Sequence, residues 1–328
     1  MHMALVWSGR KLHPAALAVL EGLATLFVSD VGELNDWYAE ASAADAILLR
    51  GTTTITGEVL DRIGPRLRII ARTGIGIDRI DLAAATQRGI LVVNTPDGPT
   101  ESTAEHAIAL LLNLCKQVMV GDRMLRLQRS FPLYADLPQG LETVGTVLGL
   151  VGLGRIGSRV ATIAKALGMR VLAYDPFVTA ERATALGVET VPSLAELLQQ
   201  AQVVSLHCPA LPETYHIINA ETLGLMPRGS YLINVARGTL IDPDALLDAL
   251  RSGQLAGAGL DVFEPEPPPP DHPLFSLPNT ICTPHIGSYT SASVERMQVM
   301  ACQEIAQALR GERPQNLVNS AVWGRQRT

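Results

Sequence analysis

The residue pattern with the clearest chemical meaning is a set of three glycines followed at a distance by a carboxylate. The glycines are Gly152, Gly154 and Gly157, in the order Gly-x-Gly-x-x-Gly, and the carboxylate is Asp175. Glycines with this spacing permit a tight turn, a close approach of backbone to a pyrophosphate, and close packing of the following helix. The carboxylate accepts hydrogen bonds from a ribose 2′-hydroxyl and repels a 2′-phosphate. The pattern therefore predicts a dinucleotide site at which NAD is preferred over NADP.

The segments around the glycines have the character that such a site needs. Residues 146–151 form a short apolar run typical of a buried parallel strand, and residues 155–167 are predicted to be helical. The first turn of this helix, with Arg155 and Ile156, would present its amides and its positive dipole end to the phosphates. A second apolar strand, 170–174, ends directly before Asp175. Without these elements, the spacing would fit an ordinary glycine-rich turn with a surface aspartate.

A nicotinamide cofactor needs protein groups that handle a proton and an anionic substrate. Arg237 follows the predicted strand 231–234, and the carboxyl ends of parallel strands face the ligand crevice of an open sheet. Its guanidinium matches the two oxygens of a carboxylate better than a lysine would. The alternative role for this residue is that of a helix-capping or surface arginine. The position of Arg237 at a strand end, directly before Gly238, favours the substrate role.

His285 is the predicted general acid and base, because it directly follows the last predicted strand and a proline and a glycine restrict the backbone around it. His207 is the rival, since it also lies at a strand end. Its neighbours Cys208 and Pro209 suit a flat ring, so these three residues are expected to line the cofactor cleft. His106 lacks such a setting and is expected to be a surface or core residue.

A carboxylate partner for His285 is expected in the segment Glu264-Pro-Glu266-Pro, where the prolines remove backbone freedom. Such a partner sets the tautomer of the imidazole and stabilises the imidazolium. The residues alone do not choose between Glu264 and Glu266, and a glutamate in a proline-rich loop is more often a solvated surface residue.

These residues must be positioned by alternating strands and helices. The first part of the chain predicts a small α/β domain with short apolar strands at 4–7, 24–28, 46–49, 69–71 and 91–94. One long helix is predicted from Thr103 to about Arg126. The second part predicts a doubly wound parallel sheet, with further strands at 171–174, 203–207, 231–234, 257–261 and 280–282. A last helix at 291–310 is expected to return to the first domain.

Length and composition narrow the function classes. With 328 residues and 47% hydrophobic content the chain is large enough for about two domains with sizeable cores. A formal net charge of −6 makes nucleic acid an unexpected partner. Four scattered cysteines without C-x-x-C spacing predict neither a metal site nor a disulfide framework. No segment is apolar enough to span a membrane and the start has no signal-peptide pattern, so a cytoplasmic location is expected.

Five blocks of the sequence, in order, resemble the D-isomer-specific 2-hydroxyacid dehydrogenases over nearly the whole chain. They read RTGIGIDRID from Arg72, GLGRIG from Gly152, NVARG from Asn234, GLDVFEPEP from Gly259 and TPHIG from Thr283. The resemblance implies hydride transfer between NAD(H) and a small D-2-hydroxy acid or 2-oxo acid, as in phosphoglycerate, hydroxypyruvate and glyoxylate reductase-type members. It implies that Arg237, His285 and Glu266, rather than Glu264, are the catalytic residues.

The resemblance also implies binding residues on the cofactor side. Asp261 would hold the nicotinamide carboxamide, and Val235, Ala236 and Gly287 would line the cofactor. On the substrate side, the backbone amides of Ile75 and Gly76 would receive the substrate carboxylate.

Arg50 matches a substrate-side arginine of some members, although Gly51 stands where serine is common. Arg50 and Arg72 would suit a phosphorylated substrate, but either is also compatible with a structural or solvated role. The residues do not say which 2-hydroxy acid is used.

The family's architecture implies a discontinuous, flavodoxin-like substrate domain made of residues 1–98 and 287–328. A Rossmann-type cofactor domain, residues 99–286, would be inserted into it, with hinges near 98 and 287 that close a cleft and exclude water. Such members are typically homodimers that associate through the cofactor domain.

Two other function classes fit parts of the pattern. An NAD-sensing binding protein, like the transcriptional corepressors that resemble this family, would bind the dinucleotide without turning over a substrate. The sequence lacks the disordered flanking tails of such proteins. A formate dehydrogenase usually pairs glutamine with the histidine, where this chain has Glu266. A phosphite dehydrogenase carries a lysine in the first glycine block, where this chain has Thr73 and Ile75.

Overall fold

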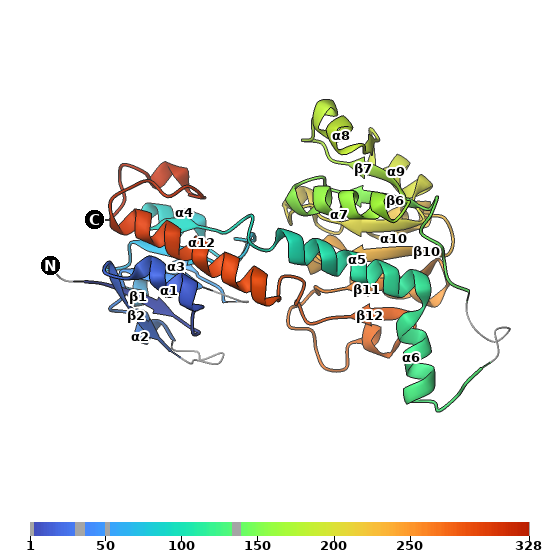
Figure 1. Ribbon diagram of the computed structural model, residues 1–328, viewed down its shortest axis with the longest axis horizontal. Helices are drawn as coiled ribbons and strands as arrows, with labels where there is room; N and C mark the ends of the chain where they lie inside the picture. Colours follow the sequence, from blue (N-terminus) through green and yellow to red (C-terminus); the bar gives the residue numbers. More distant parts are fainter. Residues whose placement is uncertain (1–2, 30–36, 50–52, 133–138, 328) are drawn as a thin grey trace. The chain divides into compact units, whose positions relative to one another are not determined.

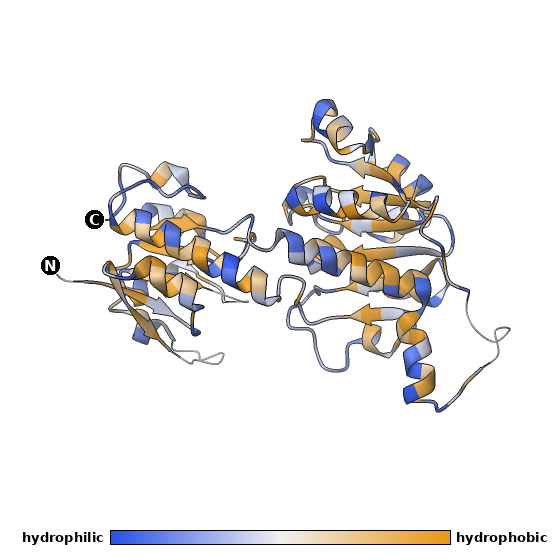
Figure 2. Cartoon of the chain, in the orientation of Figure 1, coloured by the Kyte–Doolittle hydropathy of each residue, from blue (hydrophilic) through white to orange (hydrophobic). Residues whose placement is uncertain are grey.

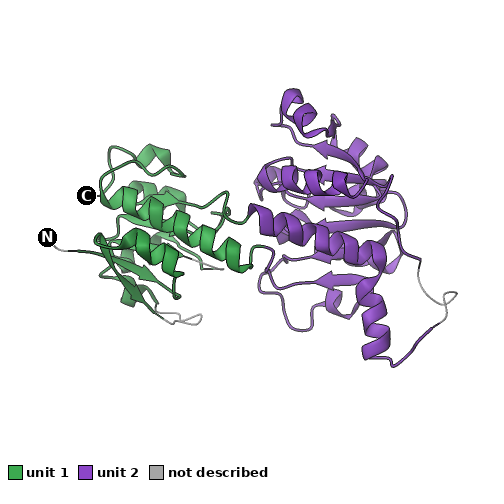
Figure 3. Ribbon diagram, in the orientation of Figure 1, with its two compact units in different colours: residues 1–99, 288–328 green, residues 100–287 purple. Residues whose placement is uncertain are grey.

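The computed structural model describes residues 3–29, 37–49, 53–132 and 139–327. The chain divides into two compact units, each with its own parallel sheet and its own core (Figure 3). Unit 1 comprises residues 1–99 and 288–328, and unit 2 comprises residues 100–287. The expected boundaries, near 98 and 287, differ from these by one residue.

Unit 1 contains a five-stranded sheet in the order β2-β1-β3-β4-β5, with all neighbouring strands parallel (Figure 1). Its strands are β1 (Ala4–Ser8), β2 (Ala24–Val28), β3 (Ala46–Leu49), β4 (Ile69–Arg72) and β5 (Leu91–Val93). This is the order of flavodoxin-like doubly wound sheets.

Both faces of this sheet are covered by helices. The helices α1 (Pro14–Leu20) and α12 (Ser291–Leu309) pack on one face, and α2 (Trp37–Ala41), α3 (Gly57–Ile63) and α4 (Leu82–Gln87) pack on the other. Successive residues of β3 alternate between the two cores, since Leu48 joins the first and Ile47 the second. The last helix thus belongs to unit 1.

Unit 2 contains a seven-stranded sheet in the order β12-β11-β10-β9-β6-β7-β8, again with parallel neighbours. Its strands are β6 (Val147–Val151), β7 (Arg170–Tyr174), β8 (Glu189–Thr190), β9 (Val203–Leu206), β10 (Ser230–Asn234), β11 (Leu255–Leu260) and β12 (Thr280–Cys282). The order is that of a Rossmann sheet with one added edge strand. The short β8, polar and exposed, is the one strand of the described chain that the sequence did not predict.

The helices of unit 2 also lie on both faces of the sheet. The helices α5 (Thr100–Lys116), α7 (Arg155–Ala166) and α8 (Ala180–Leu186) cover one face, and α9 (Leu194–Gln200), α10 (Ala220–Leu225) and α11 (Pro243–Arg251) cover the other. Figure 2 shows apolar residues along the strands and on the sheet-facing sides of these helices. No helix of the described ranges is long and apolar enough to cross a lipid bilayer.

The strand order of unit 2 locates a ligand crevice. From β6 the chain continues outward to β7 and β8, and then crosses back to β9 on the other side of β6. The connections leave the carboxyl ends of β6 and β9 in opposite directions, which is the topological switch point where open α/β sheets bind ligands. The glycine turn follows β6, and His207 follows β9.

The single long helix predicted from 103 to about 126 is wrong. Two helices occupy the region, α5 (Thr100–Lys116) and α6 (Val118–Arg126), and Gln117 between them has a left-handed backbone with φ 55°. The side-chain amide of Gln117 donates to the Leu114 carbonyl (3.0 Å) and to the Tyr231 hydroxyl (3.3 Å), which anchors the break. Because helix-forming residues continue through 117, their pattern did not reveal a break at one residue.

Candidate active site

The glycine turn after β6 has no room for side chains at two of its three glycines. Gly152 has φ 98°, and a Cβ there would lie 2.8 Å from the Cys208 amide nitrogen. A Cβ on Gly157 would lie 2.2 Å from the Gly152 carbonyl oxygen, so α7 can approach the turn only with glycine at this position. A Cβ on Gly154 would meet no protein atom within 4 Å. The turn is therefore closed towards the protein and open at Gly154, as phosphate binding requires.

The helix that follows the turn supplies amides for an anion. Gly154 is the N-cap of α7 and has no side chain to cap it, and Arg155 and Ile156 form the first turn. A helix N-terminus of this kind directs backbone N–H groups and a positive partial charge towards a ligand phosphate.

Asp175 lies beside the same turn. Its Oδ2 accepts a hydrogen bond from the Leu153 amide (2.8 Å), and its Oδ1 accepts one from the Phe177 amide (2.9 Å). The end of β7 is thus tied to the glycine turn through one carboxylate, which fixes a negative charge next to the site predicted for the phosphates.

His207 reaches the turn from β9. Its Nε2 lies 2.9 Å from the Ser205 hydroxyl, and its buried Nδ1 has no hydrogen-bond partner among the described residues. Burial lowers the pKa of His207 from 6.5 to about 4, so the ring is neutral near pH 7. Burial also raises the pKa of the Cys208 thiol to about 11, so this cysteine is not an activated nucleophile. A neutral ring and an uncharged thiol fit residues that line a cofactor cleft.

Arg237 lies three residues beyond the end of β10, and the segment before it is held by Asn234. The Asn234 side chain accepts from the Ala236 amide (3.0 Å) and donates to the Arg237 carbonyl (2.7 Å). The Arg237 guanidinium donates to the Ala236 carbonyl (2.7 Å). This local framework fixes the loop of Val235, Ala236 and Arg237 at the carboxyl edge of the sheet.

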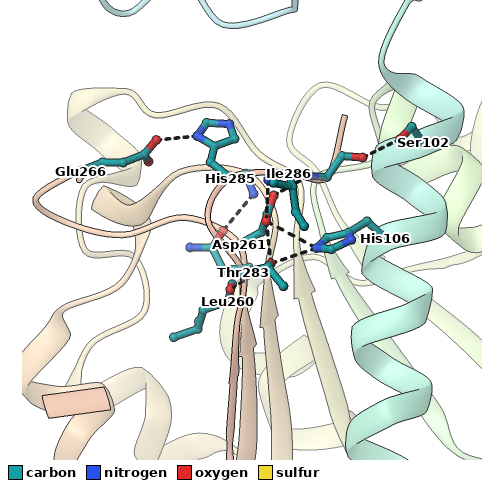
Figure 4. A network of polar contacts seen from close by, with 11 residues as sticks. Ser102, His106, Leu260, Asp261, Glu266, Thr283, His285 and Ile286 are labelled. Carbon is teal, nitrogen blue, oxygen red and sulfur yellow. Dashed lines mark hydrogen bonds and ion pairs between the residues drawn. The ribbon is translucent and has the colours of Figure 1, made fainter. Parts of the chain in front are cut away.

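His285 and Glu266 are in contact, with 2.5 Å between Nδ1 and Oε1 (Figure 4). The His285 side chain is 42% exposed and that of Glu266 15%, so a ligand can reach the imidazole while its carboxylate partner is largely covered. His285 has a left-handed backbone (φ 53°), and its amide donates to the Asp261 carbonyl (2.9 Å). Of the two glutamates that the residue pattern left open, Glu266 is the one that contacts His285.

Asp261 is buried beneath the loop that carries His285. Its Oδ1 accepts from the Thr283 hydroxyl (2.6 Å) and the Ile286 amide (2.9 Å), and its Oδ2 accepts from the Gly287 amide (2.8 Å) (Figure 4). Burial alone would raise the pKa of Asp261, but these bonds, together with His106, lower it below its ordinary value. Asp261 is therefore an ionised anchor for the loop.

His106 joins this network from α5, although nothing in the surrounding sequence marked it. Its Nε2 lies 3.0 Å from the Thr283 hydroxyl oxygen and 3.4 Å from Oδ1 of Asp261. Because Thr283 donates its single proton to Asp261, we assign the proton between His106 and Thr283 to Nε2 of the histidine. His106 is thus a half-buried residue with polar partners, which is compatible with the expectation of a surface or core residue, but its link to Asp261 was not predicted.

The remaining predicted residues lie elsewhere. Ile75 and Gly76 belong to unit 1, in the turn after β4, where Asn94 donates to the Ile75 carbonyl (2.8 Å) and Arg72 to the Gly76 carbonyl (3.4 Å). Arg50 lies outside the described residues. Within the part of the chain that the structure describes, no group of three or more His, Cys, Asp or Glu side chains is placed to hold a metal ion.

Comparison with known proteins identifies the family. Residues 108–287 match the model of the D-isomer specific 2-hydroxyacid dehydrogenase NAD binding domain. Glyoxylate reductase from Korarchaeum cryptofilum is 44% identical over 279 residues, which cover 85% of this chain and 83% of that protein. D-3-phosphoglycerate dehydrogenase from Methanocaldococcus jannaschii is 38% identical over 94% of this chain, but the match spans only 58% of that protein's length.

Solved structures agree with the sequence relatives. The TT0316 protein from Thermus thermophilus superposes with a TM-score of 0.88 and 41% identity, over 96% of this chain and 99% of that one. D-lactate dehydrogenase from Aquifex aeolicus, solved with NAD and lactic acid, superposes with a TM-score of 0.81 and 35% identity, over 94% and 96% of the two chains. The chain therefore belongs to the D-isomer specific 2-hydroxyacid dehydrogenases, a family of NAD-linked oxidoreductases.

Proposed function

We propose that this protein reduces small 2-oxo acids to D-2-hydroxy acids with NADH and catalyses the reverse oxidation with NAD. The observation that carries the proposal is the contact of His285 with Glu266, at the same carboxyl edge of the sheet as the glycine turn. A positioned imidazole with a carboxylate partner is the group that a carbonyl reduction needs for its proton.

The residues of unit 2 fit a bound dinucleotide. The pyrophosphate would lie against the glycine turn and the first amides of α7, because the turn is open at Gly154. Asp175 would accept from the ribose hydroxyls, and its charge would repel a 2′-phosphate, which favours NAD over NADP.

The residues at the strand ends would line the cofactor: His207, Cys208, Pro209, Val235, Ala236 and Gly287. Asp261 would hold the carboxamide through Oδ2, since this oxygen accepts only the Gly287 amide among the described residues, whereas Oδ1 already accepts two hydrogen bonds.

The reaction divides between the cofactor and three side chains. When bound, NADH would supply the hydride. Arg237 would hold the carboxylate and carbonyl oxygens of the substrate with its planar fork. His285 would donate a proton to the carbonyl oxygen from Nε2, because Nδ1 faces Glu266. Glu266 would accept a hydrogen bond from Nδ1–H without taking the proton, which fixes the tautomer and stabilises the imidazolium.

We propose that the amides of Ile75 and Gly76, in unit 1, bind the substrate carboxylate and that Arg50 is a substrate-side arginine. These assignments rest on the family resemblance.

A homodimer through the cofactor domain is part of the proposal, supported by α6 and the segment after it. No residue of α6, all of which is described, is buried. Four large apolar side chains in this region are more than half exposed: Val118, Leu125, Leu127 and Phe131. A concentration of exposed apolar side chains in one short segment is typical of a protein interface. Light scattering should show a dimer, and Leu127→Asp should shift it towards monomer; a wild-type monomer would contradict the assignment.

A substrate panel with both cofactors tests the proposed function. Pyruvate, glyoxylate and hydroxypyruvate would each be mixed with enzyme and NADH or NADPH, and absorbance at the nicotinamide band followed. We expect turnover of at least one oxo acid with NADH, a lower kcat/KM with NADPH, and a D-configured product from pyruvate or hydroxypyruvate. Tight NADH binding with no turnover of any oxo acid would instead indicate a dinucleotide-sensing protein.

A further inference from the structure

Glu264, the other glutamate of the Glu-Pro-Glu-Pro segment, has a histidine of its own. Its Oε2 lies 3.0 Å from Nε2 of His216, and its Oε1 lies 3.4 Å from the Tyr215 hydroxyl. The rings of Tyr215 and His216 stack with 3.9 Å between their centroids. Two glutamates that lie two residues apart on one loop therefore each contact a histidine from a different segment, and the His216 pair has no role in the proposed reaction.

The backbone of His216 is held in an unusual conformation. Its φ is 47°, in the left-handed region that side-chain-bearing residues seldom adopt. Its amide donates to the Thr239 carbonyl (2.9 Å), and the Asn219 side chain donates to its carbonyl (3.1 Å). A residue kept in such a conformation by several neighbours indicates a position that the surrounding structure specifies closely.

The segment that holds His216 is the one that carries Arg237. Thr239 lies two residues beyond Arg237, and Gly238 between them packs directly on the Glu264 loop. A Cβ on Gly238 would lie 2.0 Å from the carbonyl carbon of Phe263 and 2.6 Å from the Glu264 nitrogen. His216, the residues after Arg237, and the start of the Glu264 loop thus form one closely packed group.

We infer that the His216–Glu264 pair positions the loops that carry Arg237 and Glu266, and so keeps these two side chains at a fixed position relative to each other. The inference rests on the proposed function of those two residues. His216 holds Glu264, and Glu266 follows two residues later and contacts His285. Removing the imidazole would leave the Glu264 side chain, which is only 29% exposed, without this partner. The carboxylate would then turn towards water and loosen the loop.

The test compares two substitutions of His216. His216→Leu removes the N–H donor, whereas His216→Gln can place an amide nitrogen near the position of Nε2. We expect His216→Leu to lower kcat on the best oxo acid roughly tenfold, because small displacements of reacting groups are costly. The Kd for NADH should change less than about twofold, since His216 does not touch the glycine turn. His216→Gln should recover most of the lost kcat.

A double variant separates positioning from a merely structural role. If His216 acts through Glu266, His216→Leu should cost much less in a Glu266→Gln background than in the wild type. The inference would be overturned if the fold-losses in kcat of His216→Leu and Glu266→Gln multiply in the double variant. It would also be overturned if His216→Leu and His216→Gln lose kcat equally and both have a lower Tm. Full turnover in His216→Leu alongside an impaired Glu266→Gln would overturn it too, and would leave the proposed function standing. Full turnover in both Glu266→Gln and His285→Ala would reject the proposed function itself.

Discussion

The two halves of the carboxyl edge of the unit 2 sheet differ in the groups that they present to a ligand. The half after β6 is backbone: the amides of α7, the turn at Gly152 and a helix that approaches because residue 157 has no Cβ. The half after β10, β11 and β12 is made of side chains, with Arg237, Glu266 and His285 contributed by three separate segments. A backbone site binds an anion that many proteins share, whereas a side-chain site selects a reaction.

The two halves also differ in the contacts that hold their groups in place. The glycine turn is fixed by contacts between atoms that have no freedom to move, such as the Gly152 carbonyl beneath Gly157. His285 is held by hydrogen bonds to a buried aspartate: its own amide donates to the Asp261 carbonyl, and the Asp261 carboxylate accepts from the two amides that follow. We therefore expect changes in the first half to affect cofactor affinity, and changes in the second half to affect turnover.

The largest effect should come from His285→Ala. Loss of the general acid should lower kcat for oxo-acid reduction at least ~10²-fold, the range expected for such a group. The Kd for NADH, measured by fluorescence titration, should stay near the wild-type value. Near-normal turnover in this variant would remove His285 from the reaction.

The next effect is that of Arg237→Lys. A lysine keeps the charge but has no planar fork, so kcat/KM for the oxo acid should fall about 30-fold. Steady-state kinetics at saturating NADH would measure it. An unchanged kcat/KM would place Arg237 outside the substrate site.

Gly157→Ala addresses the backbone half. The new Cβ would meet the Gly152 carbonyl at 2.2 Å, which forces α7 away from the turn. Overpacking of this kind costs about 1–3 kcal/mol, so we expect roughly tenfold weaker NADH binding and a lower Tm.

Gly154→Ala is the matched control, because a Cβ there meets no protein atom within 4 Å. It should weaken NADH binding while leaving Tm unchanged. Wild-type affinity and Tm in Gly157→Ala would show that the close approach of α7 to the turn is not required.

The smallest effect concerns His207 and pH. The unfolded chain takes up a proton on this residue near pH 6.5, while the folded protein does so only at about 4. Below 6.5 the unfolded state therefore binds more protons, and the free energy of unfolding should fall by about 1 kcal/mol between pH 6.5 and 5.5. Denaturation of wild type and His207→Gln in parallel would isolate this contribution. Identical pH slopes would contradict the burial of this ring.

The contrast also explains what the sequence could predict. The glycine spacing, Asp175 and the flanking strands are local signals, so the strands and helices of unit 2 around the glycine turn could be predicted from them. Glu264 and Glu266 could not be separated by residue type, since each has a histidine and only folding decides which one it meets. His106 and His216 were missed because their partners lie far along the chain: Asp261 and Thr283 for the first, Glu264 for the second.

The helix break was missed for a related reason. Gln117 ends α5 through a contact with Tyr231, 114 residues away in sequence, and no local signal such as glycine or proline marks the position. Tertiary contacts of this kind override a helical pattern that is locally continuous.

The most direct test of the central claim measures two quantities on the same preparations of His285→Ala and Gly157→Ala. The quantities are the Kd for NADH and the single-turnover rate of oxo-acid reduction at saturating NADH, and each variant should change only one of them strongly. We predict that His285→Ala keeps the affinity and loses the rate, while Gly157→Ala loses the affinity and keeps a rate within a few-fold of wild type. Equal loss of both quantities in both variants would contradict the division of this edge into a binding half and a reacting half.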